Sequence, residues 1–479
     1  MNRIVEMTYN NHLPIPPLWR RMRDFFRDAL RDNQADFTSG SINRALGLLA
    51  IPMMLEMSME AIFAVVDIAF VSRLGINAVA VVGITEALVT VLYAIAIGLG
   101  MGVTAMVARR IGSGEINDAA RVTGQAFWIG VAVSIAIGTL GVTWSADLLQ
   151  LMGASDDVIK EGGKYTTVLL GGSVTILFLF LLNAALRGAG DAPVALRALV
   201  LANGLNIILD PCLIFGLGPF PEAGVTGAAV ATTIGRGSGV VYLAWYLLGG
   251  KGRLKFELRH LKPVPRLMKR LLRISIGGIG QFLIATSSWI IIMRIVAIYG
   301  SAPVAAYTIA LRMLEFAILP AWGLGNAAAT LVGQNLGARK PHRAERSVWA
   351  AARFNGAFLA LVGILTLIFA PDIVRLLSDD PEVLRYGTNA LRIMGIGYPM
   401  YAVGMIIIQA LNGAGDTRTP SFLNFVCFWT IQIPLAYWLA TGMALGPDGV
   451  FWSIVISESL LTVLAVLVFR RGAWRGKRV

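Results

Sequence analysis

The sequence predicts an all-α polytopic membrane protein in which twelve transmembrane helices form two six-helix lobes, related as parallel repeats, around a central cavity. The first observation is composition. Of the 479 residues, 56% are hydrophobic and only 14% are charged, which would leave a soluble protein with too little polar surface. The second observation is a series of long apolar runs, and the third is an internal repeat.

The first 44 residues form a polar arm, in which PLWRRMRDFFRDALRDN predicts an amphipathic helix. Its apolar face would hold Leu18, Met22, Phe25, Phe26, Ala29 and Leu30. Such a helix would lie on the membrane surface or dock on the cytoplasmic side of the protein itself, and the sequence leaves both open. Because the first apolar run begins near residue 46, no cleavable signal peptide is predicted.

After the arm, twelve mainly apolar runs are long enough to cross a hydrocarbon layer of roughly 30 Å. They lie near residues 46–71, 78–101, 122–143, 165–185, 194–217, 224–248, 271–298, 303–325, 349–370, 387–411, 420–440 and 448–469.

The net charge of +13 follows the topology that these runs imply. Segment 249–273 contains nine Lys or Arg and one acid, and the last ten residues contain five basic residues and no acid. The loop around 144–164, on the opposite side, is richer in acids. This is the positive-inside pattern, so we expect both termini in the cytoplasm and the protein in the cell's inner membrane. The basic charge is therefore not expected to bind nucleic acid.

The two halves of the chain resemble each other. AALRGAGD at 184–191 matches QALNGAGD at 409–416, an offset of 225 that also places Gly98 on Gly323 and Gly112 on Gly337. Six spans per half is an even number, so both halves enter the membrane in the same orientation. The predicted organisation is a first lobe over 45–248, a connector over 249–270, a second lobe over 271–470 and a tail over 471–479.

The repeat helps to distinguish structural residues from functional ones. Residues that the fold requires should recur at the offset of 225, whereas residues of a functional site need not. The glycines and GAGD turns recur, which predicts helix ends and close helix packing. Asp67 and Asp210 do not recur. Asp67 corresponds to Ile292, and Asp210 to Leu435, or to Ile433 if Pro211 is matched with Pro434. Both acids therefore belong to the first half alone.

The stretch LNIILDPCLIF, at 205–215, places two polar residues inside an apolar span. Asn206 and Asp210 are four residues apart and share a helix face. Pro211 has no N–H, so the carbonyl of Ile207 loses its helical partner. An aspartate at mid-bilayer costs about 2.5–3.5 kcal/mol and usually marks function. We expect an oxygen-rich pocket for a proton or sodium ion; the alternative is a structural polar knot between helices.

The first span carries Glu56, Glu60 and Asp67 on one face, together with Pro52, which would bend or soften the helix. Asp67 is expected to lie deepest, whereas Glu56 and Glu60 line a cavity or sit at a solvated mouth. Methionines on this span, including Met53 and Met57, would line an adaptable surface or simply fill the core.

Other intramembrane charges are expected to be paired. Arg312 and Glu315 lie three residues apart on one helix and should pair with each other. Buried ion pairs or exposed helix ends are expected for Glu86, Arg236, Arg294 and Glu458.

Several chemistries are missing from the sequence. No Walker A loop is present, all three histidines lie outside the spans, and neither a metal-ligand cluster nor a Ser-His-Asp pattern is found. We therefore expect no enzyme activity and no cofactor. Work done by such a chain would draw on an ion gradient carried by carboxylates.

Five stretches in this order resemble the multidrug and toxic compound extrusion (MATE) transporters, over about residues 45–470. They are FAVVDIAFVSRLG (63–75), LRGAGD (186–191), NIILDP (206–211), GVTGAAVAT (224–232) and LNGAGDTRTP (411–420). The resemblance implies a monomeric exporter of cationic or amphipathic small molecules, driven by proton or sodium entry through a lipid bilayer.

Within that family the chain looks closest to DinF-like and archaeal-type members. Their cation site falls by motif match on Asp67, Asn206, Asp210 and Thr232, with Pro52 at the bend of the first helix. Sodium would bind at the first three of these. Other branches of the family rely on a glutamate in the seventh helix and an aspartate in the tenth. In this sequence Gln281 is the nearest polar candidate in the seventh span, and the tenth span has no acid between Tyr398 and Leu411. These departures argue against a second-lobe cation site.

Three other functions fit parts of the sequence. A flippase for a lipid-linked precursor has a related fold, but it would need several cavity arginines, and only Arg236, Arg294 and Arg312 qualify. A major-facilitator transporter also has twelve spans, but ARRIGSGEINDAA, after the second span, lacks the usual charged loop motif. A membrane receptor or scaffold would show no ion-coupled flux.

Overall fold

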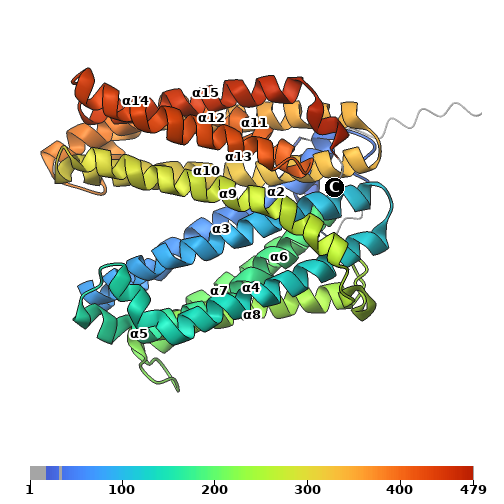
Figure 1. The fold of residues 1–479 in the computed structure, drawn as a ribbon, viewed down its shortest axis with the longest axis horizontal. Helices are drawn as coiled ribbons and strands as arrows, with labels where there is room; N and C mark the ends of the chain where they lie inside the picture. The colour runs from blue at the N-terminus through green and yellow to red at the C-terminus, as the bar shows by residue number, and fades with distance from the viewer. Residues whose placement is uncertain (1–17, 32–34, 478) are drawn as a thin grey trace, which may run out of the picture.

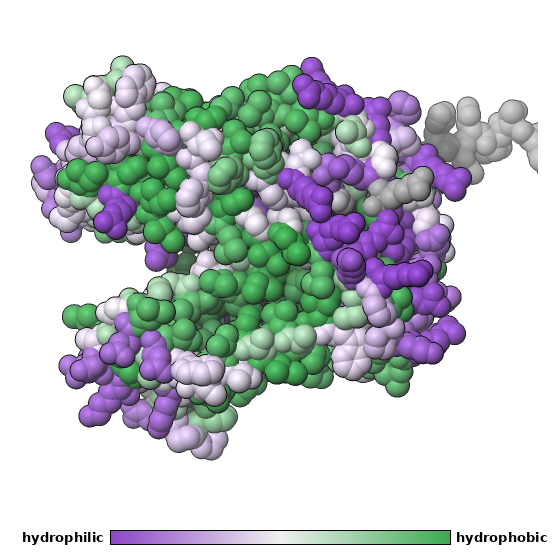
Figure 2. All heavy atoms as spheres, viewed as in Figure 1, coloured by the Kyte–Doolittle hydropathy of each residue, from purple (hydrophilic) through white to green (hydrophobic). Residues whose placement is uncertain are grey.

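The computed structural model describes residues 18–31, 35–477 and 479, which form two helical lobes. The lobes converge at one end and diverge toward the other, so that the molecule is V-shaped in profile (Figure 1). Hydrophilic residues gather at the converging end, and a broad hydrophobic band covers the middle of the molecule (Figure 2). We call the converging end, which holds the connector and the C-terminal tail, the basic end, and the diverging end the open end.

The first lobe contains seven helices that build six spans. They are α2 (Ile42–Val71), α3 (Ile76–Gly112), α4 (Ile116–Leu151), α5 (Asp156–Gly171), α6 (Ser173–Ala189), α7 (Ala192–Phe215) and α8 (Gly224–Leu248). The fourth span is shared between α5 and α6, which meet at Gly172. A short 3-10 turn follows α2 at Ser72–Leu74 (η1), and another lies within the connector at Leu258–Leu261 (η2).

The second lobe repeats this plan, with one irregular span. Its elements are α9 (Pro265–Ala297), α10 (Ser301–Gly337), α11 (Pro341–Arg375), α12 (Pro381–Gly413), α13 (Arg418–Asn424), η3 (Phe425–Gln432), α14 (Ile433–Tyr437), η4 (Trp438–Gly442) and α15 (Pro447–Arg470). The eleventh span runs from α13 to η4 and includes two π-helical stretches, η3 and η4. A last turn, η5 (Ala473–Gly476), buries Trp474 against Phe469.

The predicted fold class is confirmed. Eleven of the described helical segments are long and apolar enough to cross a membrane by length and composition. The remaining span is α8, which carries Thr232, Thr233 and Arg236 and is therefore less apolar. It packs against α5, α6 and α7 inside the first lobe. Several helices are longer than predicted; α3, for example, extends to Gly112 at the basic end.

The repeated glycines mark helix ends and close contacts, as predicted. Gly190 follows α6 with a φ of 96°, and Gly415 follows α12 with a φ of 83°, a conformation that favours glycine. At the basic end, Gly112 of α3 lies against the backbone of Gln334, and Gly337 of α10 lies against the backbone of Arg109. Arg109 and Gln334 are themselves 225 residues apart, so the two contacts are related by the repeat.

Because neither contact leaves room for a Cβ, we expect Gly112→Ala to separate α3 from α10 at the basic end. Gly83→Ala, on the same helix but with no atom within 4 Å of the added Cβ, is the matched control. Spin labels at Asn117 and His342, both exposed at the basic end, would report the distance. A longer distance in Gly112→Ala alone supports the contact, and equal distances in both variants contradict it.

The arm contacts both lobes at the basic end. Helix α1 (Leu18–Leu30) docks on α2, where the ring of Phe25 lies on Gly47 and Ala29 is buried, while Met22 and Phe26 stay exposed. The stretch that follows it is held by the second lobe, because Lys340 Nζ and Arg343 Nη1 donate to the carbonyls of Thr38 and Gly40 at 2.9 and 2.8 Å.

The same stretch is tied to the connector and to itself. The Arg253 guanidinium lies over the ring of Phe37, 4.8 Å from its centroid, and donates to the carbonyl of Ala35. Hydrogen bonds from Ser39 and Thr38 lower the pKa of Asp36 to about 2. Residues 35–41 therefore bridge the two lobes across the basic end.

Candidate functional site: an acidic cavity between the lobes

A cavity of about 520 Å³ lies between the lobes and is lined by both. This volume is typical of sites for drug-sized molecules. Figure 2 shows the space between the lobes opening at the end away from the hydrophilic, basic end. Aromatic side chains line it from both sides, namely Phe63, Tyr93, Tyr165, Phe180, Phe282 and Trp322.

Acids outnumber bases on the cavity wall. The five acids are Glu56, Glu60, Asp67, Glu86 and Glu315, and the two bases are Arg187 and Arg236. Four of the five acids come from the first lobe. The cavity is thus an apolar and aromatic space with an excess of carboxylates, which suits a positively charged guest.

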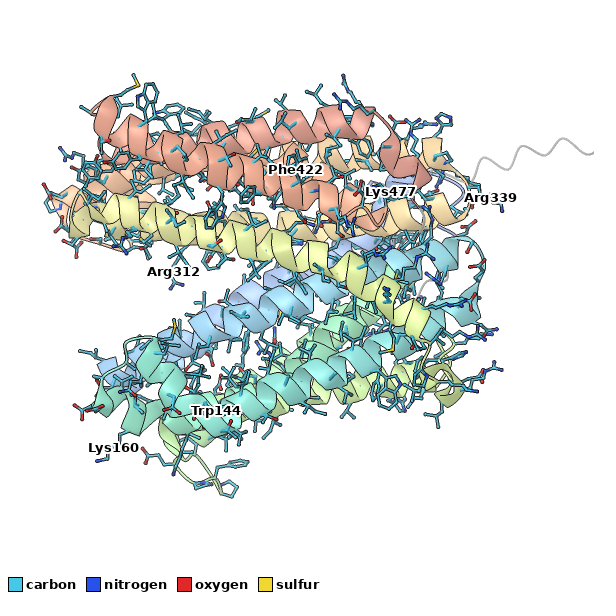
Figure 3. All side chains as sticks on the ribbon, viewed as in Figure 1. Trp144, Lys160, Arg312, Arg339, Phe422 and Lys477 are labelled. Carbon is cyan, nitrogen blue, oxygen red and sulfur yellow. The ribbon has the colours of Figure 1, made fainter. Side chains whose placement is uncertain are left out.

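Near the open end, charges from the two lobes face each other. Figure 3 shows Arg312 reaching from α10 into the space between the lobes. It is close enough to interact electrostatically with Glu86 of the first lobe and with Glu315 of its own helix. The predicted Arg312–Glu315 pair is a through-space interaction, and no hydrogen bond joins the two side chains.

The floor of the cavity is a buried ion pair. Arg187 Nη1 lies 3.0 Å from Glu56 Oε1, and the side chains are 12% and 2% exposed. Asn183 Nδ2 donates to the same carboxylate oxygen at 3.3 Å. Of the two expectations for Glu56, the solvated mouth is wrong, because α6 brings Arg187 onto it where the lobes converge.

The turn after Arg187 also ties the two lobes together. Thr330 Oγ1 donates to the carbonyl of Arg187 at 3.1 Å, and Gln334 Nε2 donates to the carbonyl of Gly188 at 3.0 Å. Both donors lie on α10 of the second lobe. Below the ion pair, then, the basic end is closed by direct contacts between the lobes.

The predicted polar pair on α7 forms a buried cluster with Thr232 of α8. Asn206 Nδ2 donates to Asp210 Oδ1 at 3.3 Å and to Thr232 Oγ1 at 3.2 Å. Asp210 is 0% exposed and Asn206 2%. Thr232 lines the cavity, whereas Asn206 and Asp210 lie behind it.

Asp67 completes this group from α2. Its carboxylate lines the cavity and is close enough to Asp210 for the two to interact electrostatically. Asp67 Oδ1, Asn206 Oδ1 and Asp210 Oδ2 are all buried without a hydrogen-bond partner among the described residues. Three such acceptors are costly unless water, a cation or a proton satisfies them. The four residues predicted for cation coupling are therefore brought together.

Local sequence explains why the cluster forms. The four-residue spacing puts Asn206 and Asp210 on one face of α7, and Pro211 removes the N–H that would pair with the Ile207 carbonyl. On α8, a Cβ at Gly235 would meet the Ala202 carbonyl at 2.6 Å and Asn206 Cβ at 3.0 Å. Only a residue without a side chain lets the two helices approach this closely.

Arg236 lies beside these carboxylates without a direct ion pair among the described residues. Its Nη2 donates to the Tyr93 hydroxyl at 2.6 Å, and its guanidinium lies 5.7 Å from the ring centroids of both Phe63 and Tyr93. It interacts through space with Glu60 and Asp67. The buried ion pair, one of the two states expected for Arg236, does not form, because the guanidinium contacts the rings of Phe63 and Tyr93 instead.

The remaining predicted residues divide between cavity and core. Glu60 and Met57 line the cavity, but Met53 is fully buried in the core beside α10. Pro52 is buried, and α2 is one continuous helix across it. Gln281 does not line the central cavity. Its Nε2 donates to Asn412 Oδ1 at 2.9 Å, and its Oε1 accepts from Asn412 Nδ2 at 3.1 Å.

Sequence reasoning missed Arg187, Asn183 and Tyr93. One signal was available: Arg187 lies inside LRGAGD, where the second half has Asn412 at the same offset. The charge of Arg187 occurs in only one half of the repeat. The same criterion selected Asp67 and Asp210. The repeated GAGD turn instead predicts a helix end at this place.

Comparison with known proteins agrees with this arrangement. The family model MatE matches residues 52–212 and 279–438, one stretch in each half. The chain is 28% identical to the Probable multidrug resistance protein NorM of Thermotoga maritima, over 91% of this chain and 94% of that protein. It is 27% identical to a protein of Shewanella oneidensis named FAD transporter, with coverage of 90% and 95%.

Solved structures give the same result. One is described as the outward-facing conformation of a multidrug resistance MATE family transporter of the MOP superfamily. It superposes with a TM-score of 0.86 at 27% identity, over 92% of this chain and 98% of that one.

Proposed function

This chain belongs to the MatE family of membrane transporters, and we propose that it exports cationic or amphipathic small molecules by antiport with protons or sodium. It is a multi-pass membrane protein and not an enzyme. The proposed coupling site is formed by Asp67, Asn206, Asp210 and Thr232. The proposed working unit is a monomer in the inner membrane, with both termini in the cytoplasm and no bound cofactor.

The substrate class is supported by the charge of the cavity wall. Five acids against two arginines attract an organic cation, and the aromatic side chains provide faces for its apolar parts. The relative named FAD transporter suggests a different substrate, but a flavin dinucleotide carries negative phosphates. Such a molecule would be repelled by this wall, so we do not extend that substrate to this chain.

The coupling site is supported by the three unpartnered oxygens of Asp67, Asn206 and Asp210. Among the described residues, no group of three or more His, Cys, Asp or Glu could hold a metal ion. A sodium ion would therefore need the amide and hydroxyl oxygens as well as the two carboxylates. A proton needs only one carboxylate. The cluster fits both ions, and transport assays decide between them.

The conformation is proposed to be outward-open. The positive-inside rule assigns the basic end to the cytoplasm, and the cavity opens at the other end. In this state a cation arriving from outside meets Asp67 at the cavity wall. Its entry would neutralise the carboxylates and weaken their hold on a cationic substrate. One charge moving inward across 100 mV supplies roughly 2.3 kcal/mol.

The test is export from proteoliposomes under a proton gradient alone and a sodium gradient alone. The probes are tetraphenylphosphonium, a neutral dye of similar size and a lipid-linked pyrophosphate. We expect the organic cation to move under at least one gradient while the other two do not. Movement of the lipid probe without the cation would instead identify a flippase. No gradient-driven flux of any probe would refute the proposal.

A further inference from the structure

A second, smaller cavity of about 170 Å³ lies within the second lobe. It adjoins the central cavity, because the two share wall residues Met101, Phe282, Trp322, Gln409 and Asn412. The volume equals that of about six water molecules at liquid density. We call this space the second-lobe chamber; it has room for an ammonium group with short substituents.

The chamber combines aromatic walls with one carboxylate. Its aromatic residues come from α9, α10, α12 and η3 and are Phe282, Trp289, Trp322, Tyr401 and Phe428. Glu458 of α15 is the acid, and no Lys, Arg or His among the described residues lines the space. Glu458 forms no hydrogen bond or ion pair within the described part of the chain, so the buried ion pair, one of the two states expected for it, is not found.

A second unsatisfied group lies in the same wall. Asn424 is 8% exposed, and its side-chain oxygen is buried without a hydrogen-bond partner among the residues described. Asn424 ends α13, directly before the π-helical stretch η3 that carries Phe428. π-helical turns are rare and often occur at functional sites. The irregular backbone thus places an amide oxygen and an aromatic ring in one wall of the chamber.

The repeat supports a special role for these residues. The positions 225 residues earlier are all without charge or aromatic ring: Trp289, Trp322, Tyr401 and Glu458 correspond to Ala64, Ile97, Ile176 and Thr233. Packing alone did not require them in the first lobe. They satisfy the criterion that distinguished Asp67 and Asp210.

We propose that the second-lobe chamber is a binding site for a small quaternary or protonated amine, with Glu458 supplying the opposite charge and Trp289, Trp322 and Tyr401 enclosing the cation. Aromatic faces attract ammonium groups, most strongly where water is excluded. A bare metal ion is less suited, since it needs several oxygen ligands and the wall is mainly carbon. The site goes beyond antiport through the first lobe, because binding here requires no gradient and none of Asp67, Asn206, Asp210 and Thr232.

The test uses the full chain in lipid nanodiscs without an ion gradient, labelled with 5-fluorotryptophan. The Trp289 fluorine resonance is assigned by its loss in Trp289→Leu. Choline is titrated in parallel with 3,3-dimethylbutan-1-ol, a neutral molecule of the same shape. We expect a saturable shift of the Trp289 resonance with choline and at least about tenfold weaker binding of the alcohol.

Variants locate the charge that matters. Glu458→Gln should weaken choline binding at least about tenfold, whereas Glu458→Asp should retain part of it. Glu222→Gln, in an exposed loop, and Trp438→Leu, on an exposed face, are matched controls that should bind normally. Should Glu458→Gln fail to fold, Tyr401→Leu tests the aromatic wall instead and should also weaken binding.

Equal binding of choline and the alcohol would overturn the proposal, as would unchanged choline binding in Glu458→Gln or no shift of the Trp289 resonance. This result is separable from first-lobe coupling. Gradient-driven export can fail while the choline shift persists, and the shift can be absent while export proceeds.

Discussion

Replacing Asp210 with asparagine should abolish gradient-driven export and leave a folded protein. Asparagine has nearly the same shape and can still bond Asn206, so the buried contacts of α7 and α8 are kept. The variant removes the negative charge that Asp210 would offer to an incoming cation. Export of tetraphenylphosphonium from proteoliposomes should fall to the level of protein-free liposomes under both proton and sodium gradients.

The control is Asp147→Asn, an exposed aspartate on α4 outside the cavity. It should export like the original protein. Undiminished export by Asp210→Asn would remove Asp210 from the coupling site. If Asp147→Asn lost as much export as Asp210→Asn, the loss of export could not be assigned to the cluster of Asp67, Asn206, Asp210 and Thr232.

Replacing Arg187 with leucine should strongly destabilise the protein. Glu56 would remain 2% exposed without its ion-pair partner, and breaking a buried pair on one side costs about 3–5 kcal/mol. The apparent melting temperature in detergent should fall by several degrees. The double variant Glu56→Gln, Arg187→Leu should recover much of the loss, because no unpaired charge is then buried.

Arg392→Leu, an exposed arginine on α12, serves as the control and should melt near the original temperature. If the double variant is no more stable than Arg187→Leu, the loss of stability comes from the packing of the leucine and not from the unpaired charge of Glu56. The cycle of single and double variants therefore measures the coupling between Glu56 and Arg187.

The fold was predictable because membrane helices must satisfy their backbone internally, so long apolar runs have few alternatives. The repeat then predicted the two-lobe arrangement, and it predicted that Gly112 and Gly337 lie at helix ends or close helix contacts. Span α8 was recognised from the sequence although its polar residues make it the least apolar span. Which end of the V is closed depends on contacts such as Gly112 against Gln334, and these join residues far apart in the chain.

The site was predictable only where it is local. Asn206 and Asp210 share one helix, so their spacing placed them together. The Glu56–Arg187 pair and the Arg236–Tyr93 contact join different helices, and a single sequence does not pair them. For Glu458 the sequence likewise did not show which residues surround it. Its isolation from bases becomes visible only when α9, α10, α12 and η3 enclose it.

The most direct test of first-lobe coupling is competition at equilibrium between the coupling ion and the substrate. Tetraphenylphosphonium binding to the protein in nanodiscs is measured while sodium is raised at fixed pH, and again while pH is lowered without sodium. We predict that the apparent Kd rises with one of the two ions, and that Asp67→Asn, Asp210→Asn together remove this dependence. An affinity independent of both ions, or a dependence that survives in the double variant, would contradict the account.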